Sequence, residues 1–176
     1  HVFAALDQRS HRSIGGLWGA STGLLIHALQ RHWKGAILVI TADDDDSLAL
    51  GADIDSFRPE RAKEAPPRCL VTELYDIDGQ IDQVSRSQRV RVLGELQKDD
   101  RFLLIGSVDA LTQPAPSRRN LGRGRVERKV GSKFDPEKLL IKATTAGLRD
   151  VPLVLAPGEI SRRGDILDVY PMASPD

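Results

Sequence analysis

Short apolar runs and stretches with helical spacing alternate through the first two thirds of the chain. The run 36–40 is wholly apolar and rich in β-branched residues, which predicts a parallel inner strand covered on both faces. The segments 68–74 and 102–105 predict two further strands. Apolar residues with helical spacing predict a loop and then a helix within 17–33, a second helix that carries apolar residues at 48–57 after a polar cap at 41–46, and a third helix at 84–97. This alternation is typical of a parallel α/β layer.

The last third of the chain has a different pattern. Residues 112–125 combine prolines, glycines and arginines with almost no apolar side chains, which predicts a boundary. A capping aspartate and a proline at 135–137 predict a helix start, and Gly147 predicts its end. Strand-like runs at 151–155, 159–162 and 165–170 predict an antiparallel ribbon. We therefore expect an α/β domain at 1–113 and a smaller α+β domain at 114–176, with the chain ending inside the second.

Composition excludes several classes of protein. A chain of 176 residues buries about 70% of its unfolded surface, so a hydrophobic core is expected. Basic and acidic residues number 25 each, so the whole chain lacks the basic excess of a nucleic-acid binder. The single cysteine excludes an intrachain disulfide, and no Cys or His pair has zinc-ligand spacing. No apolar run is long enough to span a bilayer, so we expect a cytoplasmic chain without a membrane partner.

The charges are unevenly distributed. Four consecutive aspartates, Asp43–Asp46, resemble a metal site, but neighbouring residues point in different directions, so we favour a helix cap and predict no metal. A basic run spans 118–133, and we favour a solvated loop over a phosphate-contacting patch. If the run does contact nucleic acid, the candidate residues are Arg118, Arg119, Arg123 and Arg125.

A glycine-rich stretch before the first predicted helix resembles a phosphate-binding loop. In the frame of eight residues that begins at Gly16 and includes Gly19, Ser21 occupies the glycine position, Thr22 the lysine position and Gly23 the hydroxyl position. A working loop needs the lysine for the outer phosphates and the hydroxyl for magnesium. We therefore predict a degenerate nucleotide loop without ATP turnover and no cofactor for this chain. Trp18 adds bulk to the same loop.

The order of these features resembles the N-terminal module shared by transcription-repair coupling factors and UvrB, one of the components of excinuclease ABC. The most specific stretch is 157–171, Pro-Gly-Glu-Ile-Ser-Arg-Arg-Gly-Asp-Ile-Leu-Asp-Val-Tyr-Pro, which is similar to the family signature Gly-Glu-(three residues)-Arg-Gly-(two residues)-Leu/Ile-Asp-Ile/Leu-Phe-Pro. Less distinctive matches lie at 16–21, 36–43, 85–90 and 102–111. Thr22 favours the coupling factor, because UvrB keeps the lysine.

The resemblance implies a RecA-like remnant followed by a domain that binds UvrA, another component of excinuclease ABC. The family's partner-binding arginines match Arg149 and Arg163, with Arg162 adjacent and Glu159 positioned to pair across the ribbon. RNA polymerase, double-stranded DNA, ATP and magnesium are expected to bind only the rest of the parent protein. The chain departs from the family at 72–76, which lacks the family's aromatic-rich stretch, and in its unusually basic run.

Two alternatives stay open at this point. One is an active P-loop ATPase or helicase domain of the UvrB type, which a lysine at position 22 would have favoured. The other is a simple DNA-binding module that uses the basic run, and it predicts an affinity that falls steeply with salt.

Overall fold

The computed structural model describes residues 11, 13–60, 66–98, 100–123 and 129–172. The described chain forms two compact units, one made of 1–70 and 99–112 and the other of 71–98 and 113–176. Residues 71–98 therefore group with the second unit, whereas a boundary at 113/114 assigns them to the first. The functional division at 113/114 stays a prediction.

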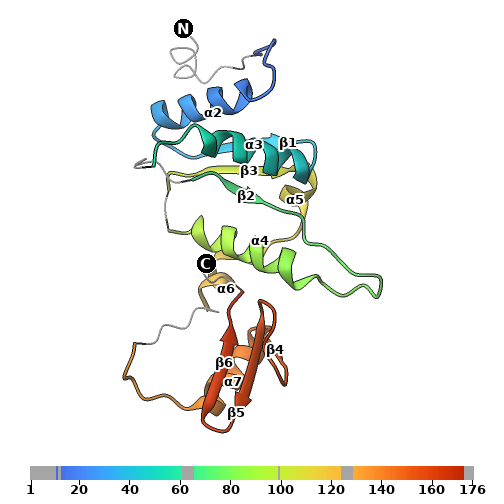
Figure 1. Cartoon of the computed structure of the whole chain (residues 1–176), viewed down its shortest axis with the longest axis vertical. Coiled ribbons are helices and arrows are strands. Elements are labelled where there is room, and N and C mark those ends of the chain that lie inside the picture. The colour runs from blue at the N-terminus through green and yellow to red at the C-terminus, as the bar shows by residue number, and fades with distance from the viewer. Residues whose placement is uncertain (1–10, 12, 61–65, 99, 124–128, 173–176) are drawn as a thin grey trace. The chain divides into compact units, whose positions relative to one another are not determined.

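The first unit is built on a three-stranded parallel sheet (Figure 1). Strands β1 (Ile37–Thr41), β2 (Arg68–Leu70) and β3 (Leu103–Ser107) pair in the order β1-β3-β2. All three were predicted, although β2 is shorter than expected. The parallel α/β layer is therefore confirmed.

The position of β1 in this sheet differs from the prediction. It pairs only with β3 among the described strands, so it lies at an edge and β3 takes the centre. Its residues alternate in burial, and Leu38 and Ile40 are 53% and 61% exposed. The expectation of an inner strand covered on both faces is therefore wrong. An apolar run shows that both faces can be buried, but not that another element covers them.

Two helices cover one face of this sheet. Helix α3 (Asp44–Ser56) packs against all three strands, and α2 (Ser21–His32) packs on α3. The buried core consists of Ile26, Ile54, Leu103 and Ile105. The Asp43 carboxylate accepts the Asp46 N–H at 2.8 Å, so the capping interpretation of the aspartate run is confirmed. A short helix, α5 (Val108–Thr112), follows β3.

The second unit contains three helices among the described residues. They are α4 (Gln83–Glu95), α6 (Arg118–Arg123) and α7 (Pro136–Thr145). Helix α7 begins as predicted, because the Asp135 carboxylate accepts the N–H groups of Glu137 and Lys138. Helix α6 was not predicted, and it packs against α4 in a segment that we interpreted as a loop. The low apolar content of this segment gave no sequence signal for α6, and the helix is supported instead by its contact with α4.

A small mixed sheet completes this unit. Strands β5 (Glu159–Arg163) and β6 (Ile166–Tyr170) are antiparallel, as predicted, while β4 (Arg149–Asp150) pairs with β5 in parallel. The strand expected at 151–155 is absent from the described structure. Leu155 and Ala156 instead donate their N–H groups to the Glu159 carboxylate, so these groups are not used for hydrogen bonds to a neighbouring strand. The predicted ribbon is therefore right for its two long strands and wrong for the first.

Candidate functional site

Charged side chains gather on one face of the mixed sheet. The register pairs Arg149 with Glu159 across β4 and β5. Because side chains alternate along a strand, Glu159 and Arg163 share this face, whereas Arg162 points to the opposite one. The structure thus brings three of the four predicted docking residues together and separates Arg162. We call this surface the arginine face, made of Arg149, Glu159, Arg163, Asp168 and Tyr170.

Glu159 organises one end of the arginine face. Its carboxylate accepts N–H groups from Leu155 at 2.8 Å and Ala156 at 2.9 Å, and a bond from Arg149 Nη2 at 2.9 Å. The two backbone N–H groups, and then the Arg149 charge, lower the pKa of the Glu159 carboxyl. Glu159 therefore stays ionised and holds both the preceding loop and the guanidinium. Its local geometry relies on Gly158, whose φ of +85° favours glycine.

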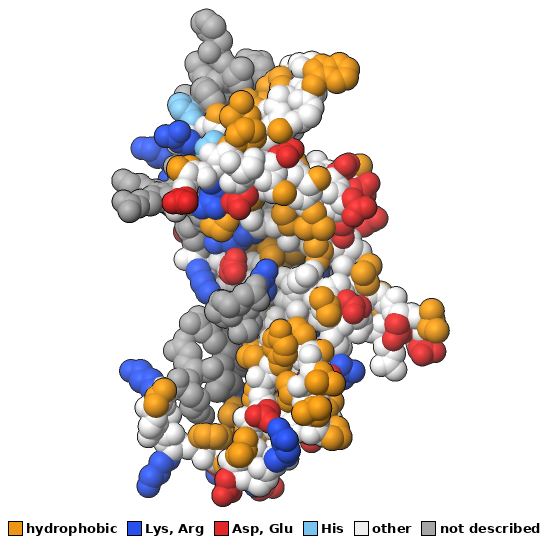
Figure 2. Space-filling view, in the orientation of Figure 1, with side chains coloured by type: hydrophobic (Ala, Val, Ile, Leu, Met, Phe, Trp, Pro, Cys, Tyr) orange, Lys and Arg blue, Asp and Glu red, His pale blue; other side chains and the backbone are white. Residues whose placement is uncertain are grey.

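Arg163 lies at the other end of the arginine face. Its Nη2 donates to Asp168 Oδ2 at 2.6 Å, and Asp168 is the diagonal neighbour of Arg163 on the same face. The side chains of Arg149 and Arg163 are 53% and 61% exposed, so both guanidinium groups are available to a partner. Arg162 instead donates to the Gly164 carbonyl from the opposite face. Figure 2 shows charged side chains of both signs beside hydrophobic ones over this sheet.

The glycine-rich stretch before α2 forms a turn. Gly16 and Gly19 have φ values of +74° and +52°, and Trp18 N–H donates to Ser21 Oγ at 2.7 Å, which closes a turn before α2. The indole of Trp18 is 85% exposed, so it does not fill the loop. The loop is therefore a turn that the Ser21 hydroxyl holds closed. Thr22 occupies the lysine position of a phosphate loop, so no charged side chain lies there.

Gly23 has a different role from the one its position in the loop suggests. It is buried on α2, and an added Cβ would lie 2.9 Å from Asp53 Cβ on α3. A serine or threonine hydroxyl, as a phosphate loop requires, would therefore meet α3 at this position. Gly23 thus allows two helices to approach closely.

The basic run is only partly described. Arg118 and Arg119 are exposed on α6. Arg123 ends the same helix, but its side chain lies outside the described residues, as does Arg125. A nucleic-acid role for this run therefore stays a prediction.

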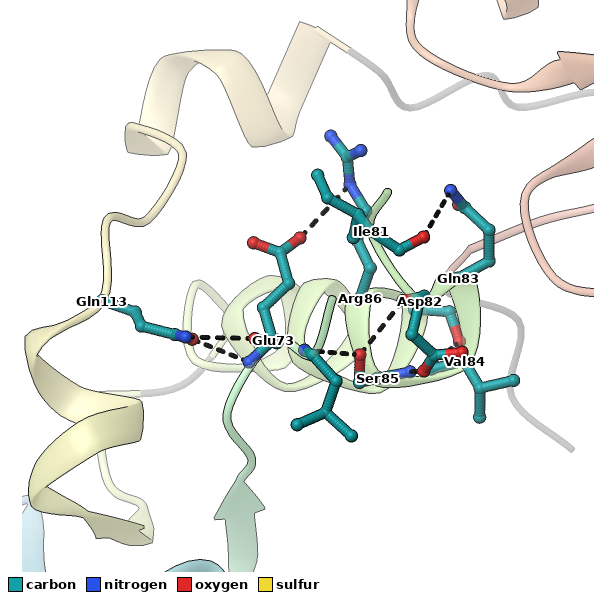
Figure 3. A network of polar contacts seen from close by, with 10 residues as sticks. Glu73, Ile81, Asp82, Gln83, Val84, Ser85, Arg86 and Gln113 are labelled. Carbon is teal, nitrogen blue, oxygen red and sulfur yellow. Dashed lines mark hydrogen bonds and ion pairs between the residues drawn. The ribbon is translucent and has the colours of Figure 1, made fainter. Parts of the chain in front are cut away.

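A polar network that the sequence did not predict anchors the segment before α4 (Figure 3). The Gln113 side chain accepts the Glu73 N–H at 2.7 Å and donates to the Glu73 carbonyl at 3.1 Å. Ser85 Oγ accepts the Leu74 N–H at 3.0 Å, and the Asp82 carboxylate caps α4 by accepting the Ser85 N–H at 2.7 Å. The Ser85 N–H lowers the pKa of the Asp82 carboxyl. Bonds between residues 40 positions apart leave no signal in local sequence.

The described part of the chain offers no other obvious chemistry. No group of three or more His, Cys, Asp or Glu residues with metal-binding geometry occurs within it. None of its helices has the length and apolarity needed to cross a membrane.

Comparison with known proteins gives the remaining evidence. No protein-family model matches the chain. Its sequence is similar to the transcription-repair-coupling factor of Bacillus subtilis, with 27% identity over 92% of this chain and 14% of the relative. The factor of Escherichia coli is also 27% identical, over 93% of this chain and 14% of the relative, and that of Myxococcus xanthus is 31% identical over 88% and 13%. The predicted resemblance is confirmed, and the chain spans about one seventh of the length of these relatives.

Proposed function

We propose that this chain is the docking region of a transcription-repair coupling factor, and that it recruits the excinuclease component UvrA to damaged DNA at a stalled RNA polymerase. Similarity to coupling factors over about nine tenths of the chain supports a role in transcription-coupled DNA repair. RNA polymerase, double-stranded DNA, ATP and magnesium would bind other parts of the parent protein, which would work in the cytoplasm.

The arginine face carries the proposal. Arg149 and Arg163 lie on one surface, and each is held by a single carboxylate, from Glu159 and Asp168 respectively. The Arg163–Asp168 pair is exposed on both sides and contributes only about 0–1 kcal/mol, so Arg163 can exchange Asp168 for a carboxylate on a partner at small cost. The Glu159 side chain is only 10% exposed, so Arg149 keeps Glu159 and offers the exposed part of its guanidinium to the partner.

The partner's chemistry follows from this surface. A guanidinium binds a carboxylate through two parallel N–H bonds, because its planar group of donors matches the two carboxylate oxygens. Tyr170 lies opposite Glu159 on the same face and is 42% exposed, so it supplies apolar area beside the charges. Arginine and tyrosine are among the residue types that most often dominate protein interfaces. We therefore infer an acidic docking surface on UvrA.

The first unit would serve as a RecA-like remnant that does not hydrolyse ATP. The loop has no lysine at Thr22, and the close approach of Asp53 to Gly23 leaves no room for a magnesium-binding hydroxyl. Two rival functions are an ATPase of the UvrB type and a DNA-binding module. Measurable ATP hydrolysis by this chain would favour the first, and DNA affinity that falls steeply with salt would favour the second.

The proposal is tested by measuring the affinity of UvrA for the chain by biolayer interferometry. Loss of one desolvated, charge-assisted contact costs about 2 kcal/mol, so Arg149→Ala and Arg163→Ala should each weaken binding by about 30-fold. Arg162→Ala is the matched control, because this arginine has the same charge and sequence neighbourhood but points to the other face. Equal binding by all three variants, or no binding by the wild type, would contradict the proposal.

A second variant separates partner contact from ribbon stability. Asp168→Ala frees Arg163 from its intramolecular carboxylate without removing the guanidinium. Binding should then be unchanged or tighter, whereas a purely structural role for the ion pair predicts weaker binding.

A further inference from the structure

The loop between β2 and α4 exposes an unusual set of apolar side chains. We call residues Leu74–Ile81 the acidic finger. Leu74, Tyr75 and Ile77 are all exposed within four positions, and Ile77 is fully exposed. The finger extends beyond the N-terminal end of α4 (Figure 1), and hydrophobic and acidic side chains lie together at its tip (Figure 2). Large apolar side chains that gather in this way mark interaction sites more often than single exposed ones do.

The finger has a defined conformation. Tyr75 and Ile81 form an antiparallel bridge, and the Asp76 carboxylate accepts N–H groups from Asp78 at 2.9 Å and Gln80 at 2.7 Å. Its base is fixed to α4 by the network of Figure 3. A partner therefore meets side chains that are already positioned, and little loop entropy is lost on binding.

The charge of this region selects the class of partner. Residues 73–85 contain Glu73, Asp76, Asp78 and Asp82 and no lysine or arginine. A nucleic-acid backbone would be repelled by these carboxylates. The finger instead fits an apolar groove on a protein surface that is bordered by cations.

A groove of this kind occurs on the same chain. It has a volume of about 340 Å³, which is at the lower end of ligand-sized sites and suits one or two side chains. Its lining is mainly apolar, made of Phe134, Leu139, Leu167, Val169 and the fully exposed Val130. Lys129 is the one charged residue among the lining residues that the structure describes, so the groove carries positive charge.

The groove is distinct from the arginine face. Leu167 and Val169 lie on the opposite side of β6 from Asp168 and Tyr170, because side chains alternate along the strand. Docking of UvrA on the arginine face and occupation of the groove are therefore separate events with separate residues.

We propose that the acidic finger of one copy of this chain inserts Ile77 and Tyr75 into the groove of a second copy. Asp78 then lies against Lys129, which lines the groove. Finger and groove are different surfaces, so the contact is head-to-tail and leaves a free finger at one end and a free groove at the other. Association therefore continues beyond a dimer as the concentration rises. The contact is small, so we expect affinity from about 10 μM to about 1 mM that weakens with added salt.

Sedimentation equilibrium of the full chain tests this inference. The weight-average mass should rise above the monomer value of 19.3 kDa with concentration. Ile77→Ser in the finger and Val169→Asp in the groove should each return the chain to a monomer. Ile141→Ser is the matched control, since Ile141 is an exposed isoleucine on α7 that does not line the groove, and it should associate like the wild type.

Charge exchange identifies the contact itself. Asp78→Lys and Lys129→Glu should each weaken association by at least about tenfold, and the double variant should recover most of it, because the opposite charges meet again. Circular dichroism of each variant checks that the fold is kept. A chain that stays monomeric up to about 1 mM overturns the proposal. Association that persists in both Ile77→Ser and Val169→Asp also overturns it.

Discussion

Substitution of Gly23 by alanine tests the close approach of α2 and α3, on which our view of the glycine loop depends. The new Cβ would lie 2.9 Å from Asp53 Cβ and 3.3 Å from both the Asp53 carbonyl carbon and the Ile54 nitrogen. Two of these three neighbours are backbone atoms, so rotation of a side chain does not relieve the contact. The helices must therefore move apart, and this loosens the packing of Ile26 against Ile54.

The expected magnitude combines two opposing effects. Overpacking of a well-filled contact costs about 1–3 kcal/mol. Alanine in place of a helical glycine returns up to about 1 kcal/mol. We therefore expect Gly23→Ala to lower the free energy of unfolding by about 1–2 kcal/mol, and the Tm by about 2–8 °C for a chain of this size.

Urea denaturation followed by far-UV circular dichroism measures this change. Gly94→Ala on α4 is the matched control, since no atom lies within 4 Å of its added Cβ, and it should leave stability unchanged or raise it by up to about 1 kcal/mol. The double variant Thr22→Lys and Gly23→Ser supplies the lysine and the hydroxyl of a phosphate loop, while Ser21 still occupies its glycine position. It should be less stable than the wild type and inactive towards ATP. Wild-type stability in Gly23→Ala, or ATP turnover by the double variant, would refute the reasoning.

Two further predictions concern Glu159 and Gly51. Because the Leu155 and Ala156 N–H groups lower the pKa of Glu159, its carboxylate stabilises the fold above the usual glutamate pKa of about 4.3, and this stabilisation is lost as the pH falls further. Thermal melts between neutral pH and about pH 3 should show a smaller acid-side loss of Tm in Glu159→Gln than in the wild type, and parallel curves would contradict the assignment. An added Cβ at Gly51 would lie 2.5 Å from Cys69 Sγ, so Gly51→Ala should lower stability by about 1–2 kcal/mol, and Cys69→Ala should suppress most of this loss in a double-mutant cycle.

The sequence predicted the elements of this fold better than their environment. The apolar run at 36–40 forms a strand, but only the structure shows that Leu38 and Ile40 are more than half exposed on an edge strand. The run 151–155 has strand-like composition and forms no strand, and at its end the Glu159 carboxylate takes the N–H groups of Leu155 and the following Ala156. A carboxylate that binds backbone four residues away competes with strand pairing, and residue propensities do not report this competition.

The candidate site was predictable to a similar extent. The resemblance implied Arg149 and Arg163 as docking residues, and Arg162 was added because it is adjacent to Arg163 in sequence. Alternation along β5 separates Arg162 from Arg163 once the register with β6 is known. The parallel pairing of β4, which brings Arg149 beside Glu159, depends on a strand of only two residues, too short to give a recognisable pattern. The sequence therefore showed which residue types the site contains. Assigning them to one face or the other of the mixed sheet required the register of its strands.

The same division has a functional consequence for the mixed sheet. On the arginine face, two guanidinium groups are exposed and one of them, Arg163, is held by an exposed carboxylate that a partner can replace, so this side suits reversible recognition of an acidic surface. On the opposite face, Leu167 and Val169 line an apolar groove, where burial of a side chain rather than exchange of an ion pair would supply the binding free energy. Salt should weaken binding at the first face through screening of the charges, whereas at the second it should act mainly through Lys129. Two partners of different chemistry can therefore occupy the two faces of one short strand, β6, at the same time.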